Sequence, residues 1–555
     1  MVTFNSRYLS YKEVSEQFIE TRNFDRLAKS CHSILMGARG SGKTTMLKML
    51  QPEAIKQYKI KKPDFDVQFY GIYIPSDRQW SFVLEQLVGA ENPFLNNISR
   101  ALVNLNVLLA FLETLNVVLR DKDIDESCTY KFCKSLITYW KLDDKTPPLI
   151  DFIRLELRSM SMELQNAVTE GNFSYKIPYI CTSNFVDCLS QAIEIVDFYY
   201  AAYDMKSHWA LCFDEMEIAP EWLKEEIVGL NLRSRNQRLL FKLTTTPEWE
   251  ISQHNYRDAT AGNDFEIIKC WNADLDNVND WRHFCDCVIE SQILRKYHIE
   301  RNDLNDLITI KNPDRSFFLE NLPKVDRGFA DYFKRDYTLD ENNKAAIMRT
   351  STRSKYYNTL VLAMRYFHFC NENRKVASIN NTYLGDWLLY NMADGNPRAL
   401  LNILNEIPSK MEVNGKLKMN IPSLGRVVRE YSKAAVDDRI SYCALKEVRI
   451  ANETFTFRTL LDKIGLFFNS ELLGETYCPM PRTMFAIDGQ ECLREFIKVG
   501  LESGFIVKVE DKASYLGRYK LGVYRLSYIL YPFYGYVSTG IKEVVEIDEI
   551  LKFKI

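Results

Sequence analysis

The chain has 555 residues, a formal net charge of −3 and a sequence pI of about 6.2. This balance excludes the strongly basic composition of a dedicated nucleic-acid binder, and the length predicts three or four domains of roughly 150 residues each. The 13 cysteines lack zinc-type spacing and no apolar secretory segment opens the chain, so we expect a cytoplasmic protein with reduced thiols.

The first predicted elements are those of an α/β fold. Residues 11–28 predict an amphipathic helix, and the apolar residues 33–36 predict a short strand. A glycine-rich segment and a helix beginning near Lys43 follow. Residues 67–74 are β-branched and aromatic and predict a second strand.

The glycine-rich segment, GARGSGKT, runs from Gly37 to Thr44 and matches the phosphate-binding Walker A pattern. Its glycines let backbone N–H groups converge on phosphates, and a helix N-terminus adds further donors. We expect Lys43 to reach the β- and γ-phosphates of ATP and Thr44 to bind Mg²⁺ through its hydroxyl. A chance glycine turn is the alternative, but the strand and helix around the motif are the context it needs. The predicted nucleotide-binding residues here are Gly37, Ala38, Arg39, Gly40, Ser41, Gly42, Lys43, Thr44 and Thr45.

Residues 77–207 are largely helical in pattern and predict an insertion between core strands. Its most apolar part, 101–119, is long enough to suggest a membrane span. Asn104, Glu113 and Asn116 interrupt it, and such polar residues are costly in lipid. We therefore expect a buried core helix and no membrane association.

The apolar run 209–213 ends in Asp214 and Glu215, the pattern of a Walker B strand. Asp214 is expected to bind Mg²⁺ directly or through water, and Glu215 to polarise the attacking water. The alternative, an acidic helix cap after a strand, is weakened by the upstream Walker A motif. Glu217 is interpreted as a solvated helix residue.

The next apolar strand, 239–243, ends in three consecutive threonines. A polar side chain at this position can contact the γ-phosphate; Thr245 is the first choice and Thr246 the second, with ordinary strand-end chemistry as the alternative. Residues 265–271 predict one more strand. Strands alternating with helical segments predict a parallel sheet with helices on both faces.

The remaining chain is helical from about 275 to 410, apart from an expected loop-rich excursion over 302–343. The sequence GNPR, ending in Arg398, opens an apolar helix over 399–407. Pro at a helix start is structurally routine, and the functional alternative gives Arg398 a phosphate contact from a second domain.

The last part of the chain changes character. Residues 455–468 and 489–504 predict helices, and 505–510 and 519–530 predict two strands around a turn at 512–517. Helices followed by such a hairpin predict a winged-helix module.

The motifs GARGSGKTT, LCFDEMEIAP, KLTTTP and GNPRALL, in this order, resemble those of AAA+ ATPases of the origin-recognition-like initiator clade. The resemblance implies that Glu215 is the catalytic glutamate, Thr245 the sensor 1 residue and Arg398 the sensor 2 arginine. It also implies composite sites in which an arginine of one subunit completes the site of the next. The candidates for that arginine are Arg257, which suits the family best, and Arg233 or Arg235.

The expected architecture is an AAA+ ATPase core over 1–275 with a helical insertion over about 77–207, a helical lid over 276–425 and a winged-helix-like domain over 426–555. The first functional hypothesis is an Mg-ATP-driven conformational or assembly switch, acting as a homo-oligomer or with a partner protein. Bacterial proteins of this layout resemble stand-alone switch ATPases, some of them associated with phage defence. The second hypothesis is a DNA-bound initiator or loader. The third is a non-hydrolysing nucleotide-gated scaffold, which the presence of the expected catalytic residue Glu215 argues against.

Overall fold

The computed structural model divides into two compact units, which are described separately. Unit 1 consists of Met1–Gly37 and Gly42–Cys270, and unit 2 of Ala38–Ser41 and Trp271–Ile555. The structure describes residues 6–80, 95–170, 177–230, 232, 238–247, 264–270, 278–308, 314–338, 358–370, 383–413, 416–417, 426, 428–434, 437, 447–450, 453–487, 491–509, 522–537 and 543–554.

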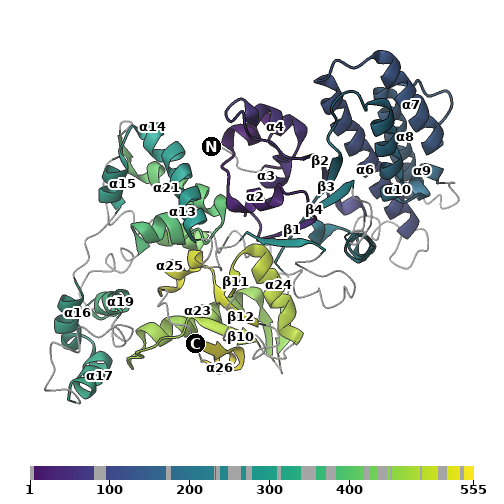
Figure 1. Cartoon of the computed structure of the whole chain (residues 1–555). Coiled ribbons are helices and arrows are strands. Elements are labelled where there is room, and N and C mark those ends of the chain that lie inside the picture. Colours follow the sequence, from purple (N-terminus) through teal and green to yellow (C-terminus); the bar gives the residue numbers. More distant parts are fainter. Residues whose placement is uncertain are drawn as a thin grey trace. The chain divides into compact units, whose positions relative to one another are not determined.

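A five-stranded parallel sheet in the order β2-β3-β4-β1-β5 lies at the centre of unit 1 (Figure 1). Met36 is in register with Thr245, and Pro75 with Asp214, so the carboxyl ends of these strands share one edge of the sheet. This is an α/β fold of the P-loop type, as the alternating pattern predicts. The strands are β1 (Ser33–Met36), β2 (Phe69–Pro75), β3 (His208–Asp214), β4 (Leu239–Thr245) and β5 (Glu266–Lys269).

The N-terminal helices cover one face of this sheet. The single helix expected over 11–28 is wrong, because Phe18 and Thr21 adopt extended backbone and the Thr21 hydroxyl accepts the N–H of Phe24 to begin a second helix. Gly71 of β2 lies against the end of α3, where a Cβ would stand 2.5 Å from the carbonyl oxygen of Leu50. The helices are α1 (Tyr11–Gln17), α2 (Arg22–Leu27), α3 (Lys43–Lys48) and α4 (Pro52–Lys59).

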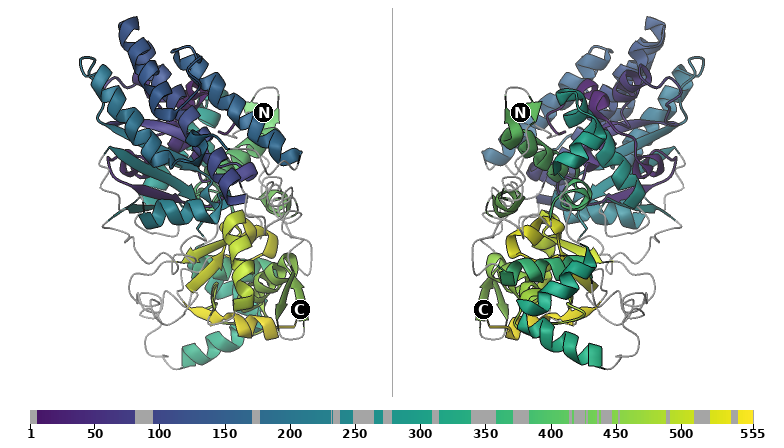
Figure 2. Two further views of the ribbon diagram at one scale, coloured as in Figure 1. Left: turned by 90° about the vertical axis from the view of Figure 1, so that its right-hand side faces the viewer. Right: turned by 90° about the vertical axis from the view of Figure 1, so that its left-hand side faces the viewer.

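The expected helical insertion lies between β2 and β3, and Figure 2 shows its blue helices side by side. Helix α6 is apolar and long enough to cross a membrane, with a mean hydropathy of 1.8, but 61% of its most apolar window is buried. Its Asn104 donates to the carbonyl of Cys181 (3.1 Å), so this polar group is satisfied inside the protein. The elements are η1 (Arg78–Trp80), α6 (Leu95–Arg120), α7 (Glu126–Trp140), α8 (Ile150–Thr169), α9 (Tyr179–Thr182) and α10 (Phe185–Tyr199).

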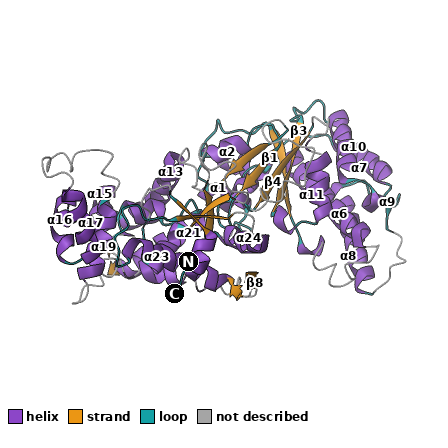
Figure 3. Ribbon diagram, turned by 90° about the horizontal axis from the view of Figure 1, so that it is seen from below, coloured by secondary structure: helices purple, strands orange, loops and turns teal. Residues whose placement is uncertain are grey.

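Side-chain alternation along β3 connects the sheet to both helical layers, which flank the strands in Figure 3. Trp209 packs on Phe111 of α6 and Phe213 on Phe185 of α10, with ring centroids 5.1 and 6.1 Å apart. The even-numbered residues of β3 face the opposite layer, and Cys212 belongs to the core with α1 to α4. Three short elements follow β3: η2 (Met216–Ile218), α11 (Glu221–Glu225) and the π-helical turn η3 (Glu226–Leu230).

The first part of unit 2 is helical. The loop-rich excursion expected over 302–343 is wrong for its described residues, which include three helices. Phe318, Leu322 and Phe329 pack with Leu362 in a buried cluster, and this burial orders the charged segment. The elements are α13 (Val278–Ile289), η7 (Glu290–Leu294), α14 (Arg295–Tyr297), α15 (Arg301–Ile308), α16 (Arg315–Asn321), η8 (Leu322–Lys324), α17 (Arg327–Thr338), α19 (Thr359–Phe369), η12 (Trp387–Asn391) and α21 (Pro397–Met411).

The C-terminal part of unit 2 contains a four-stranded sheet in the order β11-β12-β10-β13. Helix α24 leads into the antiparallel hairpin of β11 and β12, the order expected for a winged helix. The turn at 512–517 lies outside the described residues, and the winged helix stays a prediction. The elements are β6 (Glu412–Val413), β7 (Lys416–Leu417), β8 (Glu447–Ile450), β9 (Glu453–Thr456), α23 (Phe457–Leu473), β10 (Met484–Ile487), η13 (Glu491–Leu493), α24 (Arg494–Ser503), β11 (Ile506–Val509), β12 (Gly522–Leu526), η14 (Tyr528–Leu530), α25 (Tyr531–Tyr534), β13 (Val544–Glu546) and α26 (Ile547–Lys552).

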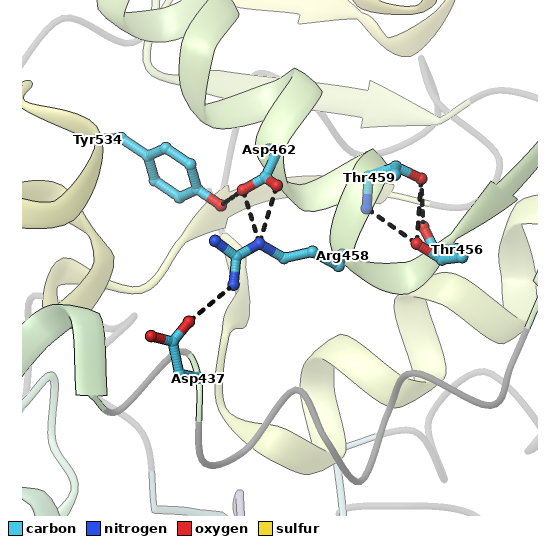
Figure 4. A network of polar contacts seen from close by, with 6 residues as sticks. All are labelled: Asp437, Thr456, Arg458, Thr459, Asp462 and Tyr534. Atoms are coloured by element: carbon cyan, nitrogen blue, oxygen red, sulfur yellow. Dashed lines mark hydrogen bonds and ion pairs between the residues drawn. The ribbon is translucent and has the colours of Figure 1, made fainter.

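A polar network connects helices α23 and α25 (Figure 4). Arg458 donates through Nε to Asp462 one turn later (2.8 Å) and through Nη1 to Asp437 (3.2 Å). The hydroxyl of Tyr534 donates to Asp462 Oδ1 (2.8 Å). The shared carboxylate of Asp462 therefore fixes α25 against α23.

Candidate functional site

The glycine-rich loop begins directly after β1. The N–H of Gly37 donates to the carbonyl of Thr245 (3.1 Å), which attaches the start of the loop to the end of β4. Gly40 and Gly42 have φ values of 90° and 87°, in the left-handed region that favours glycine. Gly42 immediately precedes α3, so the loop turns directly into the first turn of that helix.

Lys43 and Thr44 occupy the first turn of α3. The Lys43 side chain is buried, and its Nζ donates to the carbonyl of Gly37 (2.6 Å), which folds the ammonium group back over the loop. Thr44 Oγ1 donates to Asp214 Oδ2 (2.7 Å). The two predicted motifs are thus joined by a direct hydrogen bond.

Asp214 lies at the end of β3 on the face that packs against α3. Its buried carboxylate accepts hydrogen bonds from Thr44, from the hydroxyl of Tyr73 (2.9 Å) and from Thr244 Oγ1 (2.5 Å). The backbone N–H of Glu215 donates to the same carboxylate (3.1 Å). These donors from four different positions hold both carboxylate oxygens in place, the state that preorganises a metal ligand.

Glu215 has a backbone φ of 56°, which is uncommon for a residue other than glycine and typical of functional sites. Its N–H also donates to Thr244 Oγ1 (2.9 Å), so two acceptors hold this backbone conformation. Its side chain is 37% exposed, and Oε2 lies 3.6 Å from Nη2 of Arg7. The carboxylate is therefore accessible to a water molecule beside the buried Asp214.

The sequence interpretation of Glu217 as a solvated helix residue is wrong. Its Oε2 is buried and has no hydrogen-bond partner among the residues that the structure describes. Burial raises the pKa of this carboxyl group above its ordinary value, while the Lys43 charge acts in the opposite direction. One feature of the sequence could have indicated this burial: Glu217 lies only two positions after Glu215, on the segment that follows the end of β3.

The threonines that end β4 lie where the sequence predicts, but the residue that bonds to Walker B is Thr244. Thr244 lies on the same face as Leu240, which belongs to the core with α3. Thr245 is also buried, but its side chain lies on the opposite face of β4 from that of Thr244. Its carbonyl accepts a hydrogen bond from the N–H of Gly37. The sensor role of Thr245 stays a prediction, and Thr244 is a site residue that sequence reasoning did not choose.

The tip of the glycine-rich loop, Ala38–Ser41, belongs to unit 2, as does the segment that contains Arg398. The N–H of Arg398 donates to the carbonyl of Gly40 (3.2 Å), and Nδ2 of Asn396 donates to the carbonyl of Arg39 (2.9 Å). These bonds bring Arg398 beside Arg39 and Gly40 of unit 2; a phosphate contact by its guanidinium stays a prediction. The arginine-finger candidates Arg257, Arg233 and Arg235 lie outside the described residues.

The turn that precedes Arg398 is anchored within unit 2 by a residue that the sequence did not indicate. Asp394 has a φ of 51° and receives two hydrogen bonds from Arg525 of β12, each 2.7 Å long. The N–H of Tyr528 donates to the same carboxylate (3.2 Å). Both charged side chains are almost fully buried.

A model of the ORC-CDC6-like family matches residues 1–547. The chain belongs to the ORC-CDC6-like family. This finding confirms the resemblance to origin-recognition-like AAA+ ATPases that the four motifs indicate. Comparison of this ORC-CDC6-like protein with curated proteins and with solved structures gave no match.

Proposed function

We propose that this ORC-CDC6-like protein binds Mg-ATP and hydrolyses it to drive a conformational or assembly switch. The observation that carries the proposal is the hydrogen-bonded group of Thr44, Asp214 and Glu215 beside the buried Lys43. It joins a phosphate-binding loop to an acidic strand end at one edge of a parallel sheet, the position at which α/β proteins bind ligands.

The residues at the site fit Mg²⁺. Thr44 Oγ1 and Asp214 Oδ2 lie 2.7 Å apart, and both are hard oxygen ligands of the kind this ion prefers. When bound with ATP, the ion neutralises negative charge on the β- and γ-phosphates. Thr44 would hold it directly, and Asp214 directly or through water.

The chain's own residues account for the remaining steps. Lys43 would exchange the Gly37 carbonyl for phosphate oxygens, which its position at the loop allows. Glu215 would orient the attacking water and accept its proton, because its carboxylate is solvent-accessible and its backbone is fixed. The buried Asp214 keeps its two oxygens in the orientation that the site requires.

Three further roles extend the proposal by family likeness. Thr245 would act as the sensor at the end of β4, and Arg398 as the lid arginine that reports bound ATP. Arg257 of a second copy would complete the site in a homo-oligomer. A cytoplasmic switch in phage defence is the biological role that we propose by analogy.

The deciding experiment compares Glu215→Gln with Glu225→Gln, an exposed glutamate on the neighbouring helix α11. Glu215→Gln should bind Mg-ATP with an affinity within about twofold of the unmutated chain and lose at least ~10²-fold in turnover, because an amide is not a general base. Glu225→Gln should retain both. Normal turnover in Glu215→Gln, or no hydrolysis by the unmutated chain at any protein concentration, would contradict the proposal.

A second function, duplex DNA binding by the C-terminal part, is supported by the order of α24 followed by the antiparallel strands β11 and β12. Its test is a gel shift with duplex DNA at several salt concentrations, with and without ATP. Phosphate contacts predict an affinity that falls steeply with salt. No shift at low salt would exclude this function.

A further inference from the structure

The N-terminal segment Ser6–Leu9 is attached to the P-loop helix by one buried lysine. Nζ of Lys48, on α3, donates to the carbonyls of Ser6 (2.7 Å), Arg7 (3.1 Å) and Leu9 (3.0 Å). The hydroxyls of Ser6 and Thr45 lie 2.5 Å apart, which adds a second attachment one position after the proposed magnesium ligand. An ammonium group with three carbonyl acceptors satisfies its three donors, so the backbone of this segment is fixed on α3.

This attachment determines where the Arg7 side chain lies. Because the Arg7 carbonyl is held by Lys48, its guanidinium extends from a fixed point beside α3 and reaches Glu215, with Nη2 and Oε2 3.6 Å apart. The Arg7 side chain is 49% exposed and that of Glu215 37%, so the pair lies at the solvent-accessible side of the site. An ion pair this exposed contributes little to stability, because water screens both charges. Its position beside the proposed catalytic carboxylate therefore needs an explanation other than fold stability.

We propose that Arg7 acts within its own chain as an arginine that stabilises negative charge on the transferring phosphoryl group, in addition to any arginine that a second copy supplies. This inference rests on the proposed ATPase function. Glu215 must come within about 2.6–3.2 Å of the attacking water, which stands about 3–3.5 Å from the γ-phosphorus. A guanidinium 3.6 Å from the carboxylate that orients this water would therefore stand near the γ-phosphate oxygens. Its planar fork suits carboxylate and phosphate alike.

Arg7 contributes no atom to the hydrolysis that it assists. The oxygen of the water forms a bond to the γ-phosphorus while the bond from that phosphorus to the bridging oxygen of ADP breaks. One proton passes from the water to Glu215 and then to solvent. Arg7 supplies only positive charge and exchanges no proton with the reactants.

The test compares Arg7→Ala and Arg7→Lys with Arg22→Ala, which removes an exposed arginine from the nearby α2. For Arg7→Ala we expect ATP and ADP dissociation constants within about twofold of the unmutated chain. Turnover should fall by ~10³-fold, the lower end of the contribution of an arginine finger. The affinity for ADP with aluminium fluoride, measured by calorimetry, should fall at least tenfold. Arg7→Lys should recover part of both losses, and Arg22→Ala should change neither.

Several results would overturn this inference. Unchanged turnover in Arg7→Ala would remove the role, and faster turnover would make the Arg7–Glu215 pair an inhibitory contact. Equal losses of ADP affinity and of ADP–aluminium fluoride affinity would make Arg7 a ground-state binding residue. Failure of the unmutated chain to hydrolyse ATP would instead reject the proposed function, which the Glu215→Gln comparison tests separately.

A mixing experiment decides whether Arg7 acts in its own chain. Arg7→Ala and Glu215→Gln chains, mixed in equal amounts, should show no more activity than the sum of the two alone, because no chain then contains both residues. Recovery of activity would place Arg7 in a neighbouring chain's site and overturn the proposal. The same mixture made with Arg257→Ala should recover activity if Arg257 is the finger supplied by a second copy.

Discussion

Thr44 and Asp214 are joined by a 2.7 Å hydrogen bond although they lie 170 positions apart in the chain. The bond connects the first turn of α3 with the end of β3, across an insertion of helices that packs on the other face of the sheet. The two motifs meet because β1 and β3 both pair with β4 in a parallel register. The geometry of the proposed magnesium site therefore depends on the sheet and not on the length of the insertion.

Lys43→Ala should abolish tight ATP binding. The substitution removes the buried ammonium group that we expect to contact the β- and γ-phosphates, and loss of such a charged contact costs about 2–5 kcal/mol, or ~30-fold or more in affinity. Calorimetry with Mg-ATP measures the effect. Lys12→Ala, which removes an exposed lysine of α1, is the control and should bind normally. An unchanged affinity in Lys43→Ala would show that the loop does not bind ATP.

Thr244→Val should raise the Mg²⁺ concentration needed for half-maximal activity by about tenfold. The change keeps the size of the side chain but removes the hydroxyl that donates to Asp214 and accepts the N–H of Glu215. Groups that orient a metal ligand typically contribute ~10–100-fold to metal affinity. The measurement is a Mg²⁺ titration at saturating ATP.

Thr245→Val is the matched comparison, because Thr245 is the sensor that the sequence favours. A larger effect on turnover than on the Mg²⁺ requirement in Thr245→Val would support a γ-phosphate contact. If Thr244→Val leaves the Mg²⁺ requirement unchanged while Thr245→Val raises it, the interpretation of Thr244 is wrong.

The difference between Thr244 and Thr245 shows what the sequence could predict at this site. The motifs name Lys43, Thr44, Asp214 and Glu215 because each has a fixed place in a local pattern. The threonines have no such pattern. Both faces of β4 are buried, so its apolar run does not indicate which alternate residues face α3. Only the packing of Leu240 into the core with α3 determines the face of Thr244.

Long-range contacts were the other features that the sequence did not indicate. Arg7 precedes the first predicted helix, and its ion pair with Glu215 depends on the hydrogen bond from Lys48 to the Arg7 carbonyl. A helical pattern does not indicate which backbone groups a lysine such as Lys48 contacts. Glu217 was interpreted as a solvated helix residue, whereas its Oε2 is buried in the folded protein. The five strands of the parallel sheet were predictable, because their apolar runs are local and strong, whereas β10 and β13 of the C-terminal sheet were not predicted.

Glu217→Gln should make the protein more stable at neutral pH and less sensitive to pH. Burial raises the pKa of Glu217 in the folded state above its ordinary value of 4.5. The folded state therefore favours the protonated form, so its stabilisation is complete below the unfolded pKa and is lost as pH rises through the folded pKa. Glutamine cannot ionise and avoids this loss.

The measurement is chemical unfolding of unmutated and Glu217→Gln chains at about pH 4.5 and about pH 7.5, followed by a signal from unit 1. The stability advantage of the variant should be larger at the higher pH. Glu225→Gln, at an exposed position, should show no such trend. An advantage that is constant or shrinks with rising pH would mean that Glu217 is not buried as a carboxyl group.

Arg525→Met should destabilise unit 2 by about 3–5 kcal/mol, because it leaves the carboxylate of Asp394 buried without its partner. Arg158→Met, which breaks the exposed pair with Glu113 on the insertion, should cost only about 0–1 kcal/mol. Urea unfolding measures both, with a probe in the C-terminal part for Arg525→Met and a probe in the insertion for Arg158→Met. Adding Asp394→Asn to Arg525→Met should recover part of the loss, since asparagine carries no charge and tolerates the left-handed backbone of this position. An Arg525→Met chain as stable as the unmutated one, or a double variant less stable than the single one, would show that this pair does not anchor the turn before Arg398.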